Sequence, residues 1–233
     1  MLARDDAEPA AGHRGCADRT YQNAGNPALL DLIHAKPSGR ALDCGCGAGD
    51  NARILSLRGW EVDGITISPD EQSKASKICK RVLIADLESG IPPAIGGGYD
   101  LVVFSHVLEH LRNPSRVLGD VPRVLAPGGI VAVALPNVLS WRHRLQFLLG
   151  RFEYEEGGIM DSTHLRFYTF ASGRRLLESN GLIVSTATVE GILPLARKVG
   201  LPSRVVGLLD RYASTWLPGL LGWQLLYIAS VAK

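Results

Sequence analysis

The sequence predicts one α/β domain with a doubly wound sheet. Strand-like apolar runs alternate with helical patterns along most of the chain, and a glycine-rich turn follows the first of these runs. A length of 233 residues suits one large α/β domain with a substantial core. Residues 1–20 are rich in Ala, Asp, Arg and Gly without periodicity. We therefore expect a mobile arm there and a single domain over residues 21–233.

Local patterns and stop signals predict the elements in order. The first helix covers residues 27–34, and a second covers residues 50–58 and ends at Gly59. Strands cover residues 40–44 and 60–68. Five further strand-like runs complete a set of seven: residues 81–85, 99–105, 129–135, 182–189 and 225–231.

Proline and glycine mark the breaks in the second half of the chain. Pro122 interrupts the helix that follows Pro114, and the turn at residues 126–129 leads into the fifth strand. Helical patterns separate most of the strands, but no helical crossover of the usual kind separates the last two. The final strands are therefore expected to connect differently from the others.

Composition argues against several classes of protein. A net charge of +2, with no basic stripe that contains interleaved aromatic residues, argues against a nucleic-acid partner. The N-terminus lacks an apolar signal core, and no run of 18 uncharged apolar residues occurs, so neither secretion nor a membrane span is indicated. Four cysteines without paired zinc spacing fit a reducing compartment, and we expect the cytoplasm.

The most informative segment is the turn after the first strand. The strand runs into Asp43 and then into glycine at every second position, Gly45, Gly47 and Gly49, where backbone can pass close to a ligand. A dinucleotide fingerprint needs glycine at the sixth position, which is Asp50 here. A P-loop needs lysine followed by serine or threonine, which is absent. The segment resembles motif I of the class I S-adenosylmethionine-dependent methyltransferases.

This resemblance implies a Rossmann-like sheet of seven strands, mostly parallel, with an antiparallel last strand and helices on both faces. It also implies S-adenosylmethionine as cofactor and S-adenosylhomocysteine as product. Asp43 and the glycines correspond to the loop around the methionine part, and Asp86 to the acid that accepts from the adenine amine. The resemblance places these residues at the cofactor: Tyr21, Asp43, Gly45, Cys46, Gly47, Gly49, Thr66, Gln72, Asp86, Leu87 and Ser105.

The end of the second strand departs from the family pattern. A ribose-binding carboxylate is expected there, but the position holds Thr66, which offers one neutral donor. Asp63 cannot replace it, because three residues back on a strand it faces the other side of the sheet. The run Gly64–Ser68 is similar to one in cyclopropane fatty acid synthases, where a nearby glutamine helps to hold the ribose. Either the ribose is held loosely here, or Thr66 and Gln72 share the task.

Histidines are the candidate bases, because an attacking hydroxyl must lose a proton. His106 follows the tip of the fourth strand, where the family presents the methyl group, and His164 lies three residues from Asp161, which can orient its imidazole. His106, Glu109 and His110 also have the spacing His-x-x-Glu-His, which on a helix places all three on one face.

The spacing matches an inverted zinc-protease motif. The context argues against a catalytic zinc site, because the motif ends a Rossmann strand and no third ligand is signalled. Ubiquinone-pathway O-methyltransferases carry a related acidic-x-x-Glu-His segment, which keeps Mg²⁺ as an alternative. We expect no metal, with the pair Glu109 and His110 supporting the helix.

Two insertions are expected to face the substrate, at about residues 137–168 and 192–222. Both mix basic and apolar residues, so each is a candidate lid, homodimer interface or membrane-surface contact. Residues 136–155 and 161–167 resemble a bacterial subset of methyltransferases linked to glycan, glycolipid or natural-product pathways.

The predicted function is O-methylation of a small-molecule acceptor, a sugar or natural-product hydroxyl. Two alternatives stay open. The first is N-methylation of an amino sugar or another amine, which needs less help from a base. The second is a non-catalytic cofactor-binding or interaction protein, suggested by the missing ribose acid at Thr66.

Overall fold

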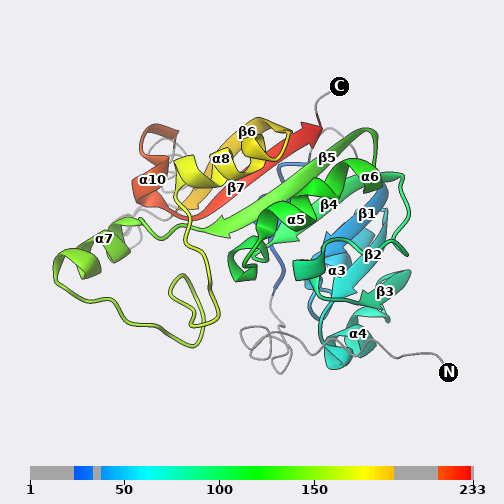
Figure 1. Ribbon diagram of the computed structural model, residues 1–233, viewed down its shortest axis with the longest axis horizontal. Helices are drawn as coiled ribbons and strands as arrows, with labels where there is room; N and C mark the ends of the chain where they lie inside the picture. The colour runs from blue at the N-terminus through cyan, green and yellow to red at the C-terminus, as the bar shows by residue number, and fades with distance from the viewer. Residues whose placement is uncertain (1–23, 34–37, 192–214, 232–233) are drawn as a thin grey trace.

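A mixed sheet of seven strands forms the centre of the molecule in the computed structural model, which describes residues 24–33, 38–191 and 215–231 (Figure 1). The predicted arm, Tyr21 and residues 192–214 of the second insertion lie outside these described residues. The strand order is β3-β2-β1-β4-β5-β7-β6. The strands are β1 (Gly39–Cys44), β2 (Trp60–Thr66), β3 (Arg81–Ile84), β4 (Tyr99–Ser105), β5 (Leu125–Pro136), β6 (Leu182–Gly191) and β7 (Gly222–Val231).

Strands β1 to β5 are parallel, and β7 runs antiparallel to both of its neighbours, β5 and β6. The predicted Rossmann-like fold with an antiparallel last strand is therefore confirmed. Because β7 runs in the opposite direction, its first residues lie at the same edge of the sheet as the last residues of β5. That edge carries the candidate active site.

Helices cover both faces of the sheet. Val117, Val121 and Leu177, from α5, α6 and α8, belong to one core cluster, and Figure 1 shows these helices on the face nearer the viewer. Leu30 and Leu55, from α2 and α3, belong to the cluster on the opposite face. The described helices are α2 (Pro27–Leu30), α3 (Asp50–Leu57), α4 (Pro69–Ala75), η1 (Leu87–Ser89), η2 (Leu108–His110), α5 (Pro114–Gly119), α6 (Val121–Val124), α7 (Trp141–Leu148), α8 (Phe170–Ser179) and α10 (Pro218–Leu221).

The central strands are apolar on both sides, as a covered parallel sheet requires. Along β4, Leu101 and Val103 face the cluster with α2 and α3, whereas Val102 and Phe104 face the cluster with α5 and α8. All four side chains are fully buried. This alternation explains why the sequence reads as a continuous apolar run there, and why the predicted bounds of β4 match the structure.

Two boundaries differ from the prediction by four residues, whereas the others agree within three. β5 begins at Leu125 rather than at Gly129, because Leu125 pairs with Tyr99 before a shift in register. The described part of the first helix ends at Leu30, short of residue 34. The break between α5 and α6 falls at Asp120, so the predicted interruption of the helix near Pro122 is present.

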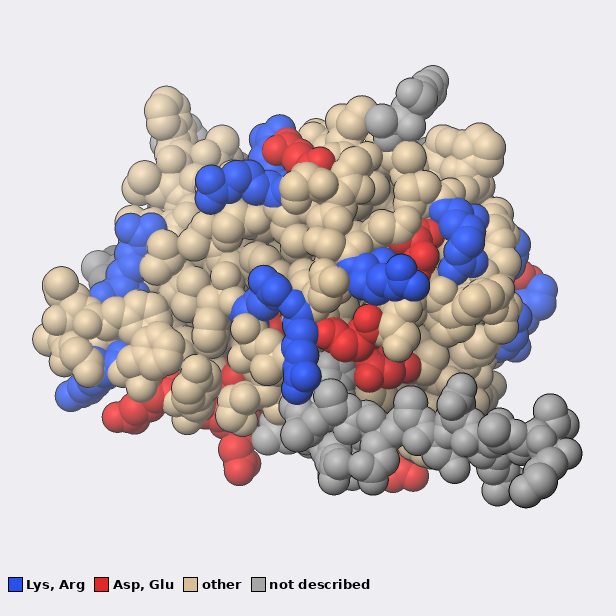
Figure 2. Space-filling model, viewed as in Figure 1, with Lys and Arg blue, Asp and Glu red and all other residues tan. Residues whose placement is uncertain are grey.

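The first insertion starts and ends at a single point of the fold. Asn137 and Tyr168 form a bridge, and the Val138 amide donates to the Tyr168 carbonyl at 3.1 Å. Between them, α7 extends away from the sheet and buries no side chain (Figure 1). In Figure 2 the surface over α7 is largely uncharged, with basic side chains beside it. Leu148 is 85% exposed. None of the helices in the described residues has the length and apolar character needed to cross a membrane.

A buried hydrogen bond connects β2 to β4. The Tyr99 hydroxyl donates to the Asp63 carboxylate at 2.6 Å, and Arg81 lies 3.5 Å from the same oxygen. Tyr168 is the opposite case, because its buried hydroxyl has no hydrogen-bond partner. These two tyrosines form a matched pair for measuring what a buried hydroxyl contributes.

We predict that Tyr99→Phe lowers the free energy of unfolding by about 1–3 kcal/mol, because it leaves a buried carboxylate short of a donor. Tyr168→Phe should be neutral or stabilising, because it removes an unsatisfied polar group. Urea denaturation of both variants and the parent tests this. Equal destabilisation by both changes would show that the Asp63 bond contributes nothing specific.

Candidate active site

A cavity of 920 Å³ opens at the carboxyl edge of the parallel strands. Its walls include Gly45 after β1, Thr66 at the end of β2, Ser105 at the end of β4 and Pro136 at the end of β5. The neighbours of β1 are β2 and β4, so the strand order reverses beside β1. Ligands of open α/β sheets bind at such a switch point. The volume suits a ligand larger than a single nucleoside.

The glycine-rich turn forms the floor of this cavity. Gly45, Gly47 and Gly49 have φ values of +80°, +53° and +92°, which favour glycine over residues with a side chain. A Cβ atom on Gly45 would lie 2.4 Å from the Val107 side chain. The amides of Gly45 and Cys46 both donate to the Ile65 carbonyl at 2.9 Å, which fixes the turn against β2. The backbone can therefore approach a ligand closely, as the sequence predicts.

Asp43 lies directly before this turn, and none of the described residues donates a hydrogen bond to its carboxylate. Its side chain is fully buried, and neither carboxylate oxygen accepts a hydrogen bond. Burial, and then the nearby Asp50 carboxylate, raise the pKa of Asp43 to about 7. A buried carboxylate without donors is costly, and such groups concentrate at functional sites. Asp43 does not line the cavity, so its charge can act on a ligand at the turn through the electric field and not by contact.

The end of β2 holds Thr66 where a ribose-binding carboxylate was expected, and the carboxylate of Glu71 from α4 lies beside it. The Thr66 hydroxyl donates to the carboxylate of Glu71 and accepts from the Ser68 amide at 3.2 Å. Thr66 and Glu71 are both buried and both line the cavity. Gln72 lies elsewhere, because its amide donates to the Val82 carbonyl at 3.0 Å. An acid in the first turn of a helix is common for electrostatic reasons, so the sequence did not single out Glu71.

Asp86 follows β3 and begins η1 as its N-cap. Its side chain accepts from the Glu88 amide at 2.9 Å and so caps η1. Asp86 and Leu87 both line the cavity. A capping role and a ligand-binding role are therefore compatible at this position.

His106 is held by both of its ring nitrogens. Nδ1 lies 3.2 Å from Glu109 Oε1, and Nε2 lies 2.9 Å from Gln224 Oε1. The Gln224 amide nitrogen donates to the Glu190 carboxylate, which fixes which end of the amide faces the imidazole. Both ring nitrogens of His106 are then donors. Burial opposes a charge on this ring, but the hydrogen bond and charge of Glu109 outweigh burial and raise its pKa.

This network changes the expected role of His106. An imidazole that donates from both nitrogens is positively charged and has no lone pair to accept a proton. The structure therefore favours a hydrogen-bond donor or a fixed positive charge at this position over the predicted base. Its backbone is also unusual, since His106 is the non-glycine residue with positive φ (+56°) among the described residues.

His164 enters the cavity from the first insertion. The Ile159 carbonyl lies 3.0 Å from its Nδ1, so that nitrogen donates and Nε2 carries the lone pair. The expected carboxylate–imidazole pair with Asp161 is replaced by this carbonyl–imidazole pair. Burial lowers the pKa of His164, which keeps the ring neutral at neutral pH. His164 is thus a better candidate than His106 for accepting a proton.

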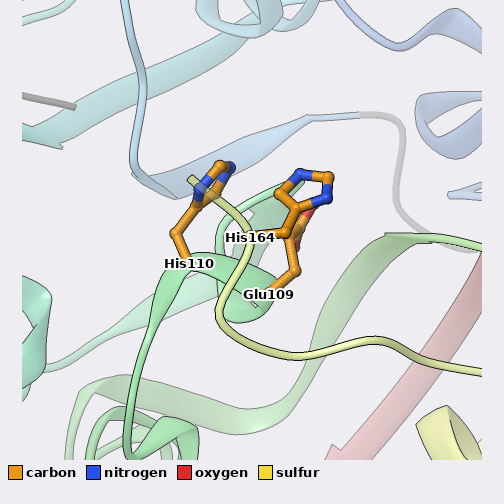
Figure 3. A group of neighbouring side chains, drawn as sticks. All are labelled: Glu109, His110 and His164. Carbon is orange, nitrogen blue, oxygen red and sulfur yellow. The ribbon is translucent and has the colours of Figure 1, made fainter. Parts of the chain in front are cut away.

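Asp161 supports His110 through a threonine. The Thr163 hydroxyl donates to Asp161 at 2.6 Å, so its oxygen is the acceptor for His110 Nδ1 at 3.1 Å. Figure 3 shows His110, His164 and Glu109 gathered where η2 meets the insertion. The backbone amides of Leu165 and Arg166 both donate to the Glu109 carbonyl. The expected shared helix face is absent, because η2 is a single 3-10 turn whose His110 ring points to the insertion.

The structure gathers most of the residues predicted from sequence in one cavity. Asp43, Gly49 and Gln72 are not among its lining residues. Those that line it are Gly45, Cys46, Gly47, Thr66, Asp86, Leu87, Ser105, His106, Asp161 and His164. The sequence analysis missed Asn26, Glu71, Glu190, Trp223 and Gln224. A glutamine within the otherwise apolar run of β7 is the signal that could have identified Gln224.

Comparison with known proteins decides the family. A family model described as a methyltransferase domain matches residues 17–186. The chain belongs to the class I S-adenosylmethionine-dependent methyltransferases. It is similar to a ubiquinone biosynthesis O-methyltransferase from Chromobacterium violaceum, with 30% identity over 191 residues that cover 74% of this chain and 78% of that protein. The methyltransferase cavity is therefore the expected site of S-adenosylmethionine.

Two other similar proteins agree with this family. A 2-methyl-6-phytyl-1,4-hydroquinone methyltransferase from Synechocystis is 30% identical over 129 residues, which cover 49% of this methyltransferase and 39% of that protein. A solved S-adenosylmethionine-dependent methyltransferase from Mesorhizobium loti shares the fold, with a TM-score of 0.58 at 19% identity. That match covers 89% of this chain and 97% of the other.

The charge of Asp43 leads to a pH-dependent prediction for the cofactor-free methyltransferase. A carboxyl whose pKa is about 7 when folded and about 3.9 when unfolded binds its proton more tightly in the folded state. Its contribution to stability is complete below the unfolded pKa and is lost as the pH rises towards 7. Asp43→Asn should therefore raise the unfolding temperature at pH 8, by the equivalent of a few kcal/mol.

The gain from Asp43→Asn should shrink as the pH falls towards 4. Thermal unfolding of the parent and the variant across this range, without added cofactor, measures it. The exposed carboxylate of Asp70 provides a control, since Asp70→Asn should cause no comparable change. Destabilisation of Asp43→Asn at pH 8 would mean that the buried carboxylate is compensated after all.

Proposed function

We propose that this methyltransferase transfers a methyl group to a hydroxyl on a small molecule, with a phenolic ring as the acceptor class to test first. The observation that carries the proposal is the division of one cavity into two ends. The glycine turn after β1, Glu71 beside the end of β2 and Asp86 after β3 lie along one half of the strand order, whereas His106 after β4 and Trp223 in β7 lie along the other. The ring of His164 packs on His110, which also follows β4. The similar proteins named for ubiquinone and hydroquinone methylation support a phenolic acceptor.

At the first end, the residues fit the parts of S-adenosylmethionine. The turn at Gly45–Gly49 suits the methionine part, and the buried carboxyl of Asp43 behind that turn favours its positive ammonium group. Glu71, together with Thr66, offers a carboxylate for the ribose hydroxyls, and Asp86 offers one for the adenine amine. The cofactor supplies a methyl group on a positively charged sulfur, ready for in-line displacement.

At the second end, the residues fit a planar acceptor that loses a proton. The Trp223 ring is 40% exposed, lines the cavity and lies parallel to the His106 ring, with 6.5 Å between centroids. An aromatic acceptor can stack in such surroundings. The neutral imidazole of His164 belongs to the cluster that receives the proton. The charged His106, whose two N–H groups are engaged by Glu109 and Gln224, provides a fixed positive charge beside the acceptor region.

Cofactor binding is predicted to depend on Glu71 and Asp86. Glu71→Gln and Asp86→Ala should each weaken S-adenosylhomocysteine binding by roughly 10- to 100-fold, the loss of a charge-assisted hydrogen bond. Gln72→Ala is the matched control, because this neighbour of Glu71 binds the Val82 carbonyl instead. Calorimetric titration measures all three. Unchanged affinity in both acid variants, or a loss in Gln72→Ala equal to that in Glu71→Gln, would contradict the proposed binding mode.

We predict that His164 is needed for methyl transfer and not for cofactor binding. His164→Ala should lower the rate of methyl transfer to a phenolic acceptor by about 10²–10⁴-fold, the usual worth of a positioned proton acceptor. The affinity for S-adenosylhomocysteine should stay the same. A screen with labelled S-adenosylmethionine and phenols, sugars and amines makes this measurement.

The same screen separates the alternatives. Methylation of amines alone, with full activity in His164→Ala, would favour N-methylation. Cofactor binding without transfer to any acceptor would favour a non-catalytic protein. Methylation confined to sugars would keep the hydroxyl chemistry and move the acceptor class away from phenols.

A further inference from the structure

A buried cluster at the acceptor end of the cavity has the ligand set of a metal site. One ligand atom from each of Glu109, His110 and His164 lies within 4.8 Å of the other two. Figure 3 shows the three side chains converging from η2 and from the first insertion. We propose that this cluster binds one divalent transition-metal ion, of which Zn²⁺ is the probe.

Both imidazoles are oriented as metal-binding histidines usually are. The Nδ1 of His164 donates to the Ile159 carbonyl, and the Nδ1 of His110 donates to the hydroxyl and carbonyl of Thr163. A histidine that donates from one nitrogen presents the lone pair of the other to a ligand. The Asp161 carboxylate fixes the Thr163 hydroxyl in turn. Each ring therefore offers Nε2, and each is held by a second layer of hydrogen bonds.

The carboxylate of Glu109 supplies the third ligand. Its side chain is fully buried, and Oε1 is engaged by His106 at 3.2 Å. The other oxygen, Oε2, is buried and has no hydrogen-bond partner. A buried carboxylate oxygen without a partner is costly unless something positive completes it. A cation between Oε2 and the two Nε2 atoms removes that cost.

The spacing requires only small movements. Zinc bonds of about 2.0–2.2 Å place tetrahedral ligand atoms about 3.4 Å apart, so a closure on the order of 1 Å completes the site. His164 and His110 line the cavity, and Glu109 lies behind them. Three protein ligands that leave one position open towards a cavity are typical of catalytic rather than structural zinc.

The ligand types select the ion. Two imidazole nitrogens and one carboxylate suit Zn²⁺ and similar ions, whereas Mg²⁺ prefers oxygen ligands and keeps its waters. His106 stands at the first position of the segment that reads acidic-x-x-Glu-His in ubiquinone-pathway O-methyltransferases. An acid at this position would favour a hard cation such as Mg²⁺, whereas the His106 ring engages the Glu109 carboxylate. The Mg²⁺ alternative from the sequence is therefore replaced by a softer ion. With the ion bound, Nε2 of His164 would be a ligand and no longer a proton acceptor, and the ion would instead lower the pKa of an acceptor hydroxyl. Only this last role rests on the proposed function.

The test measures metal binding directly. The full chain is freed of metal with a chelator, and Zn²⁺, Mg²⁺ and Co²⁺ are titrated without cofactor or acceptor. We expect one equivalent of Zn²⁺ to bind in the micromolar range or tighter, and Co²⁺ to give the visible absorption of a tetrahedral or five-coordinate site. Mg²⁺ should fail to compete. S-adenosylhomocysteine is titrated into the same samples, so that a failed cofactor site is distinguished from a failed metal site.

Variants locate the ion. His164→Ala and His110→Ala should each weaken Zn²⁺ binding by at least about 10- to 100-fold, since even the loss of supporting hydrogen bonds costs that much. His143→Ala is the matched control, because this histidine of the same insertion pairs with Ser140 and lies outside the cluster. Two variants on different elements guard against a folding defect in one. No Zn²⁺ binding by the parent, equal binding of Mg²⁺, or equal loss in His143→Ala would overturn the proposal.

Discussion

The active-site edge of this methyltransferase depends on the burial of Glu109. Its carboxylate holds the charged ring of His106, and its carbonyl accepts both amides of Leu165 and Arg166 from the first insertion. The negative charge survives burial because the surrounding histidines lower its pKa more than desolvation raises it. Glu109, in the η2 turn that follows β4, thus connects the sheet, the first insertion and the end of the cavity proposed for the acceptor.

The reversed direction of β7 completes the same edge from the other side. Gln224 lies near the start of β7, where its amide contacts His106, Asn26 and Glu190. In a fully parallel sheet the beginning of this strand would lie at the opposite edge. The antiparallel strand therefore contributes a polar network to the active-site edge of the sheet. Asn26 extends this network to α2, whose N-terminus it caps.

The sequence predicted what depends on local spacing. Asp43 and the alternating glycines, the bounds of β4 and the break before Pro122 follow from neighbours in the chain. Glu71 and Gln224 could not be found in this way, because their roles come from partners that tertiary folding brings near: Glu71 meets Thr66 across the end of β2, and Gln224 meets His106 across 118 residues. The early start of β5 likewise depends on the pairing of Leu125 with Tyr99.

The bridge between Asn137 and Tyr168 gives the first insertion a closed base. Residues within it form the acceptor wall at Glu156–Ile159 and carry His164, whereas the glycine turn, Glu71 and Asp86 lie on other elements. The insertion can therefore change in length and composition while the cofactor half of the molecule keeps its geometry. Under the proposed function, acceptor preference and methyl donation become separable traits, and exchange of the segment between Asn137 and Tyr168 is a natural route to new acceptors.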